Sequence, residues 1–371
     1  MSKPKIIAFY LPQFHPFIEN DEWWGKGFTE WTNVGKAKPL FKGHNQPRVP
    51  TELGYYDLRL PIVREQQVEL AKEAGVSAFC YWHYWFGNGR RLIADIFDEV
   101  LFSGKPDFPF CLGWANHSWM SKNWNSDGTT SEKMLMEQTY PGEEDAKLHF
   151  EFLLKAFSDP RYVKVDGAPL FYIFAPQDLP LEYINNFRQW TKEAGFPDLY
   201  LVANIAHSKV TKSGLLANGY SAVTYQRLGS RQSKFTSGGI GRRLSILLHK
   251  IKGFVIQRPP FMEDYAECYH DLVSEEDKEE NVIPTLLPQW DHTPRSGWNG
   301  KLLINSTPKY FYLHAKEVLN VLREKSDERK IIFLKSWNEW GEGNYMEPDL
   351  TNGRGFINAL KSALDEFEHH K

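Results

Sequence analysis

Short apolar runs alternate along the chain with longer segments in which apolar residues recur at helical spacing. Runs such as KIIAFYL and KIIFL consist mainly of branched and aromatic residues, which is typical of buried strands. The pattern predicts strands over residues 5–11, 77–81, 108–114, 169–174, 199–204, 221–225, 282–287 and 330–334.

Segments of helical period cover roughly residues 61–74, 91–103, 143–157, 181–194, 209–217, 262–272, 308–322 and 355–367. Pro61 suits the first turn of a helix, and Gly75 lies just past the end of the same segment. Eight strands, each with a helix, are the count of a (β/α)8 barrel. We therefore predict one α/β domain over residues 1–371, a TIM barrel with long βα loops at its carboxyl face.

A doubly wound open sheet is the alternative fold, because alternation of strands and helices does not by itself count the strands. No GxGxxG or P-loop motif follows a strand, which argues against the nucleotide-binding versions of that sheet. The chain contains neither an internal repeat nor a low-complexity linker, so nothing divides it into two domains.

Two glutamates, Glu339 and Glu342, stand just after the last apolar run, in the sequence KSWNEWGE. Burying carboxylates is costly unless something compensates for it. Glycoside chemistry uses two carboxylates within about 5–10 Å of each other, beside an apolar surface on which a sugar ring can stack. Trp337 and Trp340 bracket this pair. We therefore take Glu339 and Glu342 as candidate catalytic residues that share one cleft.

Polar and aromatic residues also follow most of the other expected strands, where a (β/α)8 barrel carries its active site. The strand bodies are apolar, whereas the residues after them are polar and aromatic. A water-filled cleft lined by aromatic residues explains this difference better than a role in stability does. We expect Tyr84, Trp114 and Trp290 to stack on a sugar. We expect the hydroxyl-binding and remaining substrate-binding residues to be His83, Asn116, Asn204, Asp291, His117, Tyr225 and Asn338.

Composition narrows the classes of function. Of 371 residues, 15% are aromatic and 13 are Trp, which suits sugar stacking. A net charge of −3 with scattered basic residues argues against nucleic-acid binding. The three cysteines lack CxxC spacing and the histidines lack an HExxH pattern, so we expect no disulfide, no metal and no other cofactor.

The first residues of the sequence and one basic segment give expectations about where in the cell the protein is located. The first residues lead straight into a strand, without the apolar stretch of a signal peptide, and no window reaches the roughly 18 apolar residues of a membrane span. We therefore expect a cytoplasmic protein. A basic insertion covers about residues 230–260, and its part 242–258 has the pattern of a basic amphipathic helix. Such a helix can be a peripheral contact at the inner face of a membrane; packing on the barrel or on another subunit is the alternative.

Long motifs at residues 7–15, 20–31, 55–59, 81–86, 114–116, 337–343 and 347–349 resemble one known group. It is the WbsX-type proteins of O-antigen (lipopolysaccharide) and capsule gene clusters, which are related to glycoside hydrolase family 99. The resemblance implies a (β/α)8 barrel without a metal and the chemistry of a retaining endo-α-mannosidase. Glu339 would assist deprotonation of the sugar 2-hydroxyl that attacks the anomeric carbon. Glu342 would act as general acid and then as base, with a raised pKa.

His117 departs from the resemblance, because related sequences usually carry a carboxylate there, and this bears on the substrate more than on the reaction class. We interpret the chain as a carbohydrate-active enzyme of cell-surface polysaccharide biosynthesis. It would cleave or transfer a glycosidic bond with retention, on a glycan or lipid-linked oligosaccharide. A sugar-nucleotide-dependent glycosyltransferase is the main alternative, although no convincing DxD motif is present, and a non-catalytic glycan-binding barrel is the third.

Overall fold

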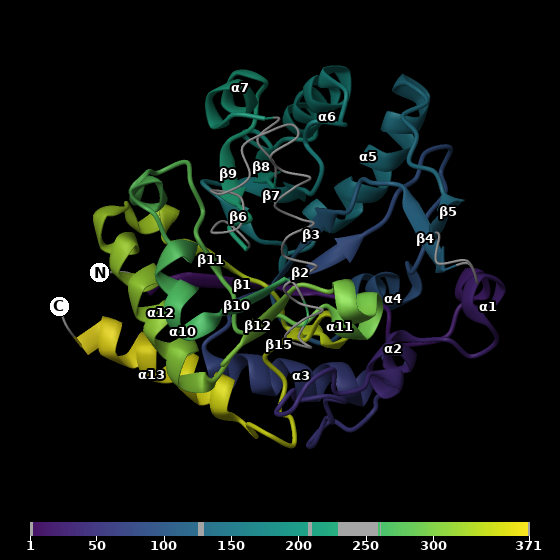
Figure 1. Ribbon diagram of the computed structural model, residues 1–371. Helices are drawn as coiled ribbons and strands as arrows, with labels where there is room; N and C mark the ends of the chain where they lie inside the picture. The colour runs from purple at the N-terminus through teal and green to yellow at the C-terminus, as the bar shows by residue number, and fades with distance from the viewer. Residues whose placement is uncertain (1–2, 125–129, 207–209, 229–258, 260, 370–371) are drawn as a thin grey trace, which may run out of the picture.

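The computed structural model describes residues 3–124, 130–206, 210–228, 259 and 261–369. At its centre, parallel strands form the (β/α)8 barrel that the sequence predicts, with helices around it (Figure 1). Within the described residues its strands are β1 (Lys5–Tyr10), β2 (Ala78–His83), β3 (Phe110–Trp114), β7 (Ala168–Ile173), β8 (Tyr200–Ile205), β9 (Ala222–Tyr225), β11 (Thr285–Leu286) and β13 (Ile331–Leu334).

The sheet runs in the order β11-β13-β1-β2-β3-β7-β8-β9 and then closes on itself. Closure occurs between β9 and the segment that leads into β11. The backbone N–H of Val223 donates to the carbonyl of Asn281 at 2.9 Å, and Ile283 N–H donates to Val223 at 2.8 Å. Because every barrel strand then has a neighbour on both sides, the carboxyl ends of all strands open at one mouth.

Aromatic side chains fill the barrel interior. Phe9 of β1 stacks on Trp82 of β2 with 4.6 Å between ring centroids, and on Phe333 of β13 at 5.1 Å. Tyr172 of β7 meets Phe9 edge-on at 4.8 Å. All four rings are buried. The strand bodies therefore form a packed core, and chemistry is left to the loops at the mouth.

The surrounding helices largely follow the predicted segments. They are α3 (Pro61–Ala74), α4 (Asp95–Ser103), α5 (Glu143–Phe157), α6 (Leu181–Glu193), α7 (Lys212–Ala217), α12 (Pro308–Val321) and α13 (Gly355–His369). Helix α3 begins at Pro61 and ends before Gly75, which adopts a left-handed φ of 85°. This conformation favours glycine, and it explains why the helix ends there.

Several short elements lie in the long loops of the barrel. They are α1 (Ile18–Trp24), α2 (Glu30–Lys36), the hairpin of β4 (Trp119–Trp124) and β5 (Thr130–Met136), β6 (Lys164–Val165), α11 (Thr293–Ser296), β14 (Asn338–Glu339) and β15 (Asn344–Tyr345). Figure 1 shows the hairpin beside α1, and the rings of Trp23 and Trp119 lie 5.8 Å apart.

The predicted continuous helix over residues 262–272 is wrong. The segment is divided into β10 (Met262–Asp264), α10 (Tyr265–Cys268) and a 3₁₀ turn (Tyr269–Leu272). Strand β10 pairs with β12 (Leu302–Ile304). The Asp264 side chain accepts a hydrogen bond from Ala266 N–H at 2.9 Å, so the helix begins only after this residue.

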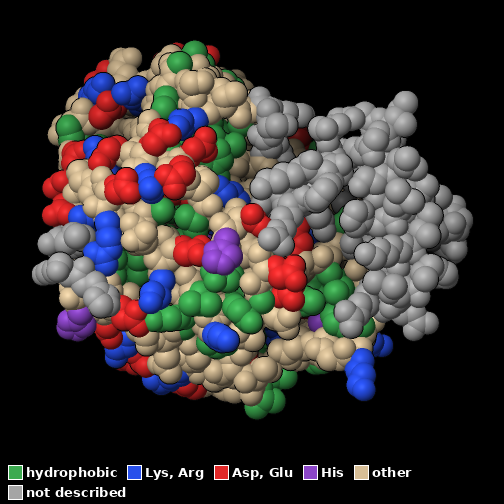
Figure 2. Space-filling view, turned by 60° about the vertical axis from the view of Figure 1, so that its left-hand side comes forward, with side chains coloured by type: hydrophobic (Ala, Val, Ile, Leu, Met, Phe, Trp, Pro, Cys, Tyr) green, Lys and Arg blue, Asp and Glu red, His purple; other side chains and the backbone are tan. Residues whose placement is uncertain are grey.

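The expected basic insertion at residues 230–260, with its candidate membrane helix 242–258, lies outside the described residues except for Pro259. No described helix is both long enough and apolar enough to cross a membrane. The ends of the described chain meet, because Lys3 Nζ lies 3.2 Å from Glu368 Oε1. Acidic and basic side chains are mixed on the face in Figure 2, rather than gathered into a field of one sign.

Candidate active site

The loop that follows β13 is fixed to the start of the chain. Asn338 accepts a hydrogen bond from the N–H of Leu11 at 2.8 Å and donates one to the carbonyl of the same residue at 3.0 Å. Ser336 Oγ accepts from the N–H of Glu339 at 3.1 Å. A 3₁₀ turn (Trp340–Glu342) then leads to Gly343, whose φ is 56°. The backbone that carries the two glutamates is thus held at both ends.

Glu339 is buried at the barrel mouth, with 6% of its surface exposed. The indole N–H of Trp82 donates to its Oε1 at 2.8 Å. Burial, reinforced by the charge of Glu342, raises the pKa of Glu339 to about 8. The carboxyl of Glu339 therefore carries a proton at neutral pH.

Glu342 has the opposite charge state. Nη1 of Arg295 lies 2.5 Å from its Oε1, and Nε2 of His292 lies 3.8 Å away. Burial alone would raise the pKa of Glu342, but Arg295 and His292 hold it below its ordinary value. A hydrogen bond with Glu339 acts in the same direction. The two carboxyl groups thus share one site, as expected, but the expectation of a raised pKa at Glu342 is wrong.

Arg295 is shared between two carboxylates. Its Nη2 lies 2.9 Å from Oε2 of Glu30, which is buried at the start of α2. Glu30 also lies against Gly341, where an added Cβ would collide with the Glu30 carboxylate. Gly341 therefore allows Glu30 and Arg295 to approach the turn that carries Glu342. No local sequence pattern predicts this arrangement, because the three charged residues come from loops after β1, β11 and β13.

A pocket opens at the mouth next to the glutamates. It is lined by Asn204, Tyr225 and Trp290, which the sequence predicts, and by Lys335, which it does not. Phe9 and Tyr172 of the barrel interior also line the pocket.

Several observations tie this pocket to the glutamates. The charge of Glu339 acts on Tyr172, and Lys335 acts on both glutamates. Tyr84 is close as well, because burial and then the Glu339 charge raise the pKa of its hydroxyl. Four of the expected substrate-binding residues, Tyr84, Asn204, Tyr225 and Trp290, therefore surround the candidate site.

Trp114 and His83 are corrected by the structure, because they lie in a buried aromatic cluster. Trp114 is fully buried, and its indole N–H donates to the carbonyl of Trp85 at 3.0 Å. His83 Nε2 is 2.8 Å from His149 Nε2, and the His83 ring stacks on Phe152. Burial lowers the pKa of both histidines well below the ordinary value. These neutral side chains hold β2, β3 and α5 together rather than contacting a sugar.

Asn116, Asp291 and Asn338 are corrected for a related reason, because protein groups satisfy their polar atoms. Asn116 donates to the carbonyl of Ala175 and accepts from its N–H, at 2.9 and 2.8 Å. Asp291 is fully buried and hydrogen-bonds His44 at 2.9 Å, Gln46 at 2.6 Å and Thr293. Asn338 holds Leu11, as described above. A polar residue after a strand is as useful for fixing a loop as for binding a ligand.

His117 lies at the exposed rim, with its ring 5.0 Å from that of Phe174. Trp82 belongs to the site although it was not among the expected residues, because its N–H reaches Glu339. No group of three His, Cys, Asp or Glu side chains in the described part of the chain is arranged to hold a metal ion.

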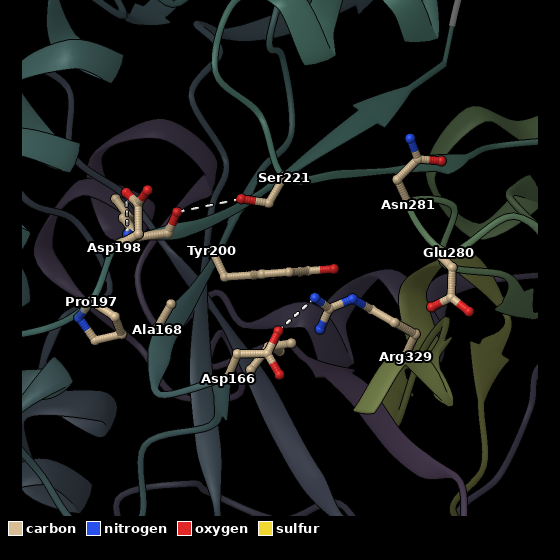
Figure 3. Close-up of a pocket in the computed structure, with 11 residues that line it drawn as sticks. Asp166, Ala168, Pro197, Asp198, Tyr200, Ser221, Glu280, Asn281 and Arg329 are labelled. Carbon is tan, nitrogen blue, oxygen red and sulfur yellow. Dashed lines mark hydrogen bonds and ion pairs between the residues drawn. The ribbon is translucent and has the colours of Figure 1, made fainter. Parts of the chain in front are cut away.

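A second cavity, of about 410 Å³, opens at the opposite end of the barrel (Figure 3). It lies where β7, β8 and β13 begin, and its charged groups are already paired. Arg329 is 2.5 Å from Asp166, and Asp198 is 2.6 Å from Arg188. This end of a (β/α)8 barrel ordinarily serves stability, so we assign no function to the cavity.

The chain resembles known proteins along nearly its whole length. Residues 6–360 match the family profile described as "Glycosyltransferase WbsX". The chain is 31% identical over 362 residues to the "Uncharacterized protein WxcX" of Xanthomonas campestris pv. campestris, which covers 97% of this chain and 49% of that protein. The chain thus spans about half the length of the curated relatives it matches.

Solved structures share the fold. A "Glycoside hydrolase-like protein" has a TM-score of 0.57 at 16% identity, covering 99% of this chain and 94% of that one. The GH99 endo-alpha-mannosidase from Bacteroides thetaiotaomicron in complex with BIS-TRIS-propane has a TM-score of 0.56 at 15% identity, covering 98% and 97%. At this identity the likeness concerns the barrel. The profile match and the sequence identity to WxcX show that the chain belongs to the family described as "Glycosyltransferase WbsX".

Proposed function

We propose that the protein cleaves or transfers a glycosidic bond with retention of configuration, using Glu339 and Glu342, in the biosynthesis of a cell-surface polysaccharide such as an O-antigen or capsule. One observation carries this proposal. Two buried carboxyl groups share a hydrogen bond at the barrel mouth, one with its pKa raised to about 8 and the other with its pKa lowered. Paired carboxyl groups in opposite charge states are what general acid–base chemistry at a sugar requires.

The charge states favour a particular division of roles. Glu342, held ionised by Arg295, takes the proton of the sugar 2-hydroxyl as this oxygen attacks the anomeric carbon. Glu339, which holds a proton, gives it to the departing glycosidic oxygen. Water or an acceptor hydroxyl then opens the anhydro-sugar, and the two protons return by the reverse path. The family resemblance assigns the two roles the other way round, and the Arg295 ion pair is the reason for the order proposed here.

The substrate in this proposal is a glycan or a lipid-linked oligosaccharide, bound across the mouth where Tyr84, Tyr225 and Trp290 present aromatic groups. The proposal includes a location on the cytoplasmic side of the membrane, as expected from the sequence. A sugar-nucleotide-dependent glycosyltransferase is the second candidate, and the description of the family is the observation that favours it.

The two candidates differ in the donor they consume. The purified chain would be incubated with glycosyl fluorides, with aryl and alkyl oligosaccharide glycosides, and with sugar nucleotides, and the anomeric configuration of the first product followed by NMR. Retained product from the glycosides supports the proposal. An inverted product, or turnover of sugar nucleotides alone, would exclude it.

Two variants test the roles. Glu339→Gln should lower the activity on alkyl glycosides about 10²–10⁴-fold, because their leaving group needs a proton. Its activity on glycosyl fluorides should fall much less, because fluoride leaves without a proton. Glu342→Gln should lose activity on both classes. The reverse pattern would restore the roles that the family resemblance implies.

A further inference from the structure

The pocket beside Glu339 is rich in hydrogen-bond donors that have no acceptor. Lys335, Trp290 and Thr224 all line it. Lys335 is half-buried where β13 ends, and its ammonium group lies 5.8 Å from the centre of the Trp290 ring. Within the residues the structure describes, Lys335 Nζ has no hydrogen-bond or ion-pair partner. A partly buried ammonium group in such a place favours an anionic neighbour.

Two neutral donors accompany this charge. The indole N–H of Trp290 and the hydroxyl of Thr224 are buried, and neither has a partner in the described structure. A buried polar group without a partner costs about 1–3 kcal/mol, so such groups in a pocket point to a ligand that supplies an acceptor. Asn204 and Gln226, on the same wall, add amide groups.

Charge and size restrict what this ligand is. The other cations nearby are already neutralised, because Arg295 serves Glu30 and Glu342 while Arg227 contacts Asp277 at 2.7 Å. The charge of Lys335 also acts on Glu339 and Glu342, but among the described residues its ammonium group makes no direct ion pair, so it can contact a ligand in the pocket. The pocket has a free volume of about 30 Å³, room for roughly two waters at 10–15 Å³ each. A planar carboxylate, with its two oxygens, is comparable to the two waters that this space holds.

We propose that this pocket binds the carboxylate of a uronic acid, so that the glycan recognised at the mouth is acidic. Lys335 supplies the charge, Trp290 and Thr224 donate hydrogen bonds to the carboxylate oxygens, and the sugar ring extends from the pocket toward Glu339 and Glu342. The inference rests on the proposed function, since it names the substrate class of that site.

Binding of simple probes tests it without any need for turnover. Affinities of methyl α-D-glucuronide, methyl α-D-glucoside and glucose 6-phosphate for the full chain would be measured by ligand-observed NMR titration. The uronide should bind at least about tenfold more tightly than the glucoside, as expected for charge-assisted hydrogen bonds. Equal binding of the two would overturn the proposal. Tightest binding of the phosphate would overturn it too, in favour of a phosphate site.

Matched variants locate the effect. Lys335→Met should abolish the preference for the uronide and leave affinity for the glucoside, whereas Lys309→Met, which removes the same charge from the exposed start of α12, should change neither. Thr224→Val removes one donor and keeps the shape, and Trp290→Phe removes the other donor together with part of the ring system, so each should lower the preference severalfold. They decide the question if Lys335→Met fails the folding check by circular dichroism. A preference that survives in the folded variants would overturn the proposal.

Failure here and failure of the proposed function remain distinguishable. If uronide binding depends on Lys335 but the protein turns over no glycoside, the proposed reaction is wrong and the carboxylate-binding pocket is supported. If the protein cleaves neutral glycosides with retention but shows no preference for the uronide, the proposed reaction is supported and the carboxylate-binding pocket is wrong.

Discussion

The guanidinium of Arg295 lies 2.5 Å from the carboxylate of Glu342, and its other nitrogen lies 2.9 Å from Glu30. One arginine thereby joins the loops that follow β1, β11 and β13. Because the same guanidinium keeps Glu342 ionised, it decides which member of the glutamate pair holds the proton.

Replacing Arg295 by Met should raise the pKa of Glu342, because the largest stabilising charge on its carboxylate is removed. If ionised Glu342 is the active form, the acidic limb of the pH profile of kcat/KM moves to higher pH. Activity near pH 6 falls at least about tenfold. Arg295→Lys keeps the charge, so the acidic limb and the activity near pH 6 should both change less. An unchanged acidic limb in Arg295→Met would remove Arg295 from the control of Glu342.

Replacing Glu339 by Gln should change how stability depends on pH. The ordinary pKa of this carboxyl is 4.5, and in the folded protein it is about 8. Between these values the folded state keeps a proton that the unfolded state loses, so folding is increasingly disfavoured as pH rises through this window. The Gln variant has no such proton to keep. Between pH 5 and pH 8 its free energy of unfolding should therefore rise by roughly 2–4 kcal/mol relative to that of the parent.

Urea unfolding at the two pH values measures this difference. Glu69→Gln, on the exposed face of α3, is the matched control and should show no such trend. A constant difference between parent and Glu339→Gln across the window would mean that Glu339 is ionised in the folded protein.

Trp82→Phe keeps a ring against Phe9 but removes the N–H that reaches Glu339. This hydrogen bond favours the ionised carboxylate, so its loss should raise the pKa of Glu339 further. With Glu339 as the acid, the alkaline limb of kcat/KM, near pH 8 in the parent, moves to higher pH. A profile measured with alkyl glycosides shows it. A shift to lower pH would contradict the hydrogen bond.

Asn338→Ala should affect stability rather than sugar affinity. It leaves the buried N–H and carbonyl of Leu11 without partners, which costs roughly 2–4 kcal/mol in free energy of unfolding. Asn185→Ala, on the exposed face of α6, is the control. Equilibrium urea unfolding provides the measurement. A stable variant with weakened glycan binding would instead return Asn338 to the substrate-binding set.

The strands and long helices could be predicted from the sequence, because their periodicity extends over many residues. Helices α3 and α5 begin and end where the pattern places them. The glutamate pair was also readable, since both members lie in one turn beside tryptophans. Helices α1 and α2 and the β4–β5 hairpin were missed, because each is short and is stabilised mainly by contacts with distant residues, such as the Trp23–Trp119 ring pair.

The charge state of the pair could not be predicted from the sequence. It depends on Glu30, Arg295 and Lys335, and no spacing in the sequence relates these residues to Glu342. Residue type alone did not separate the roles of polar residues after the strands. Asn116 and Asn204 look alike in the sequence, but Asn116 bonds both backbone groups of Ala175, whereas Asn204 donates to the carbonyl of Phe174 at 3.1 Å and also lines the pocket. Only the folded structure shows which of the two asparagines also faces a cavity.

The pairing of β1 with β13 has a consequence for biosynthesis of the protein itself. Lys5 and Ile331 are partners in this ladder, so β1 lacks one of its two barrel neighbours until more than three hundred further residues have been made. Until then one edge of β1 is open to other chains, and Leu11 lacks Asn338. Such sequence-distant pairing slows folding, and we expect the nascent chain to depend on chaperones until β13 has been made.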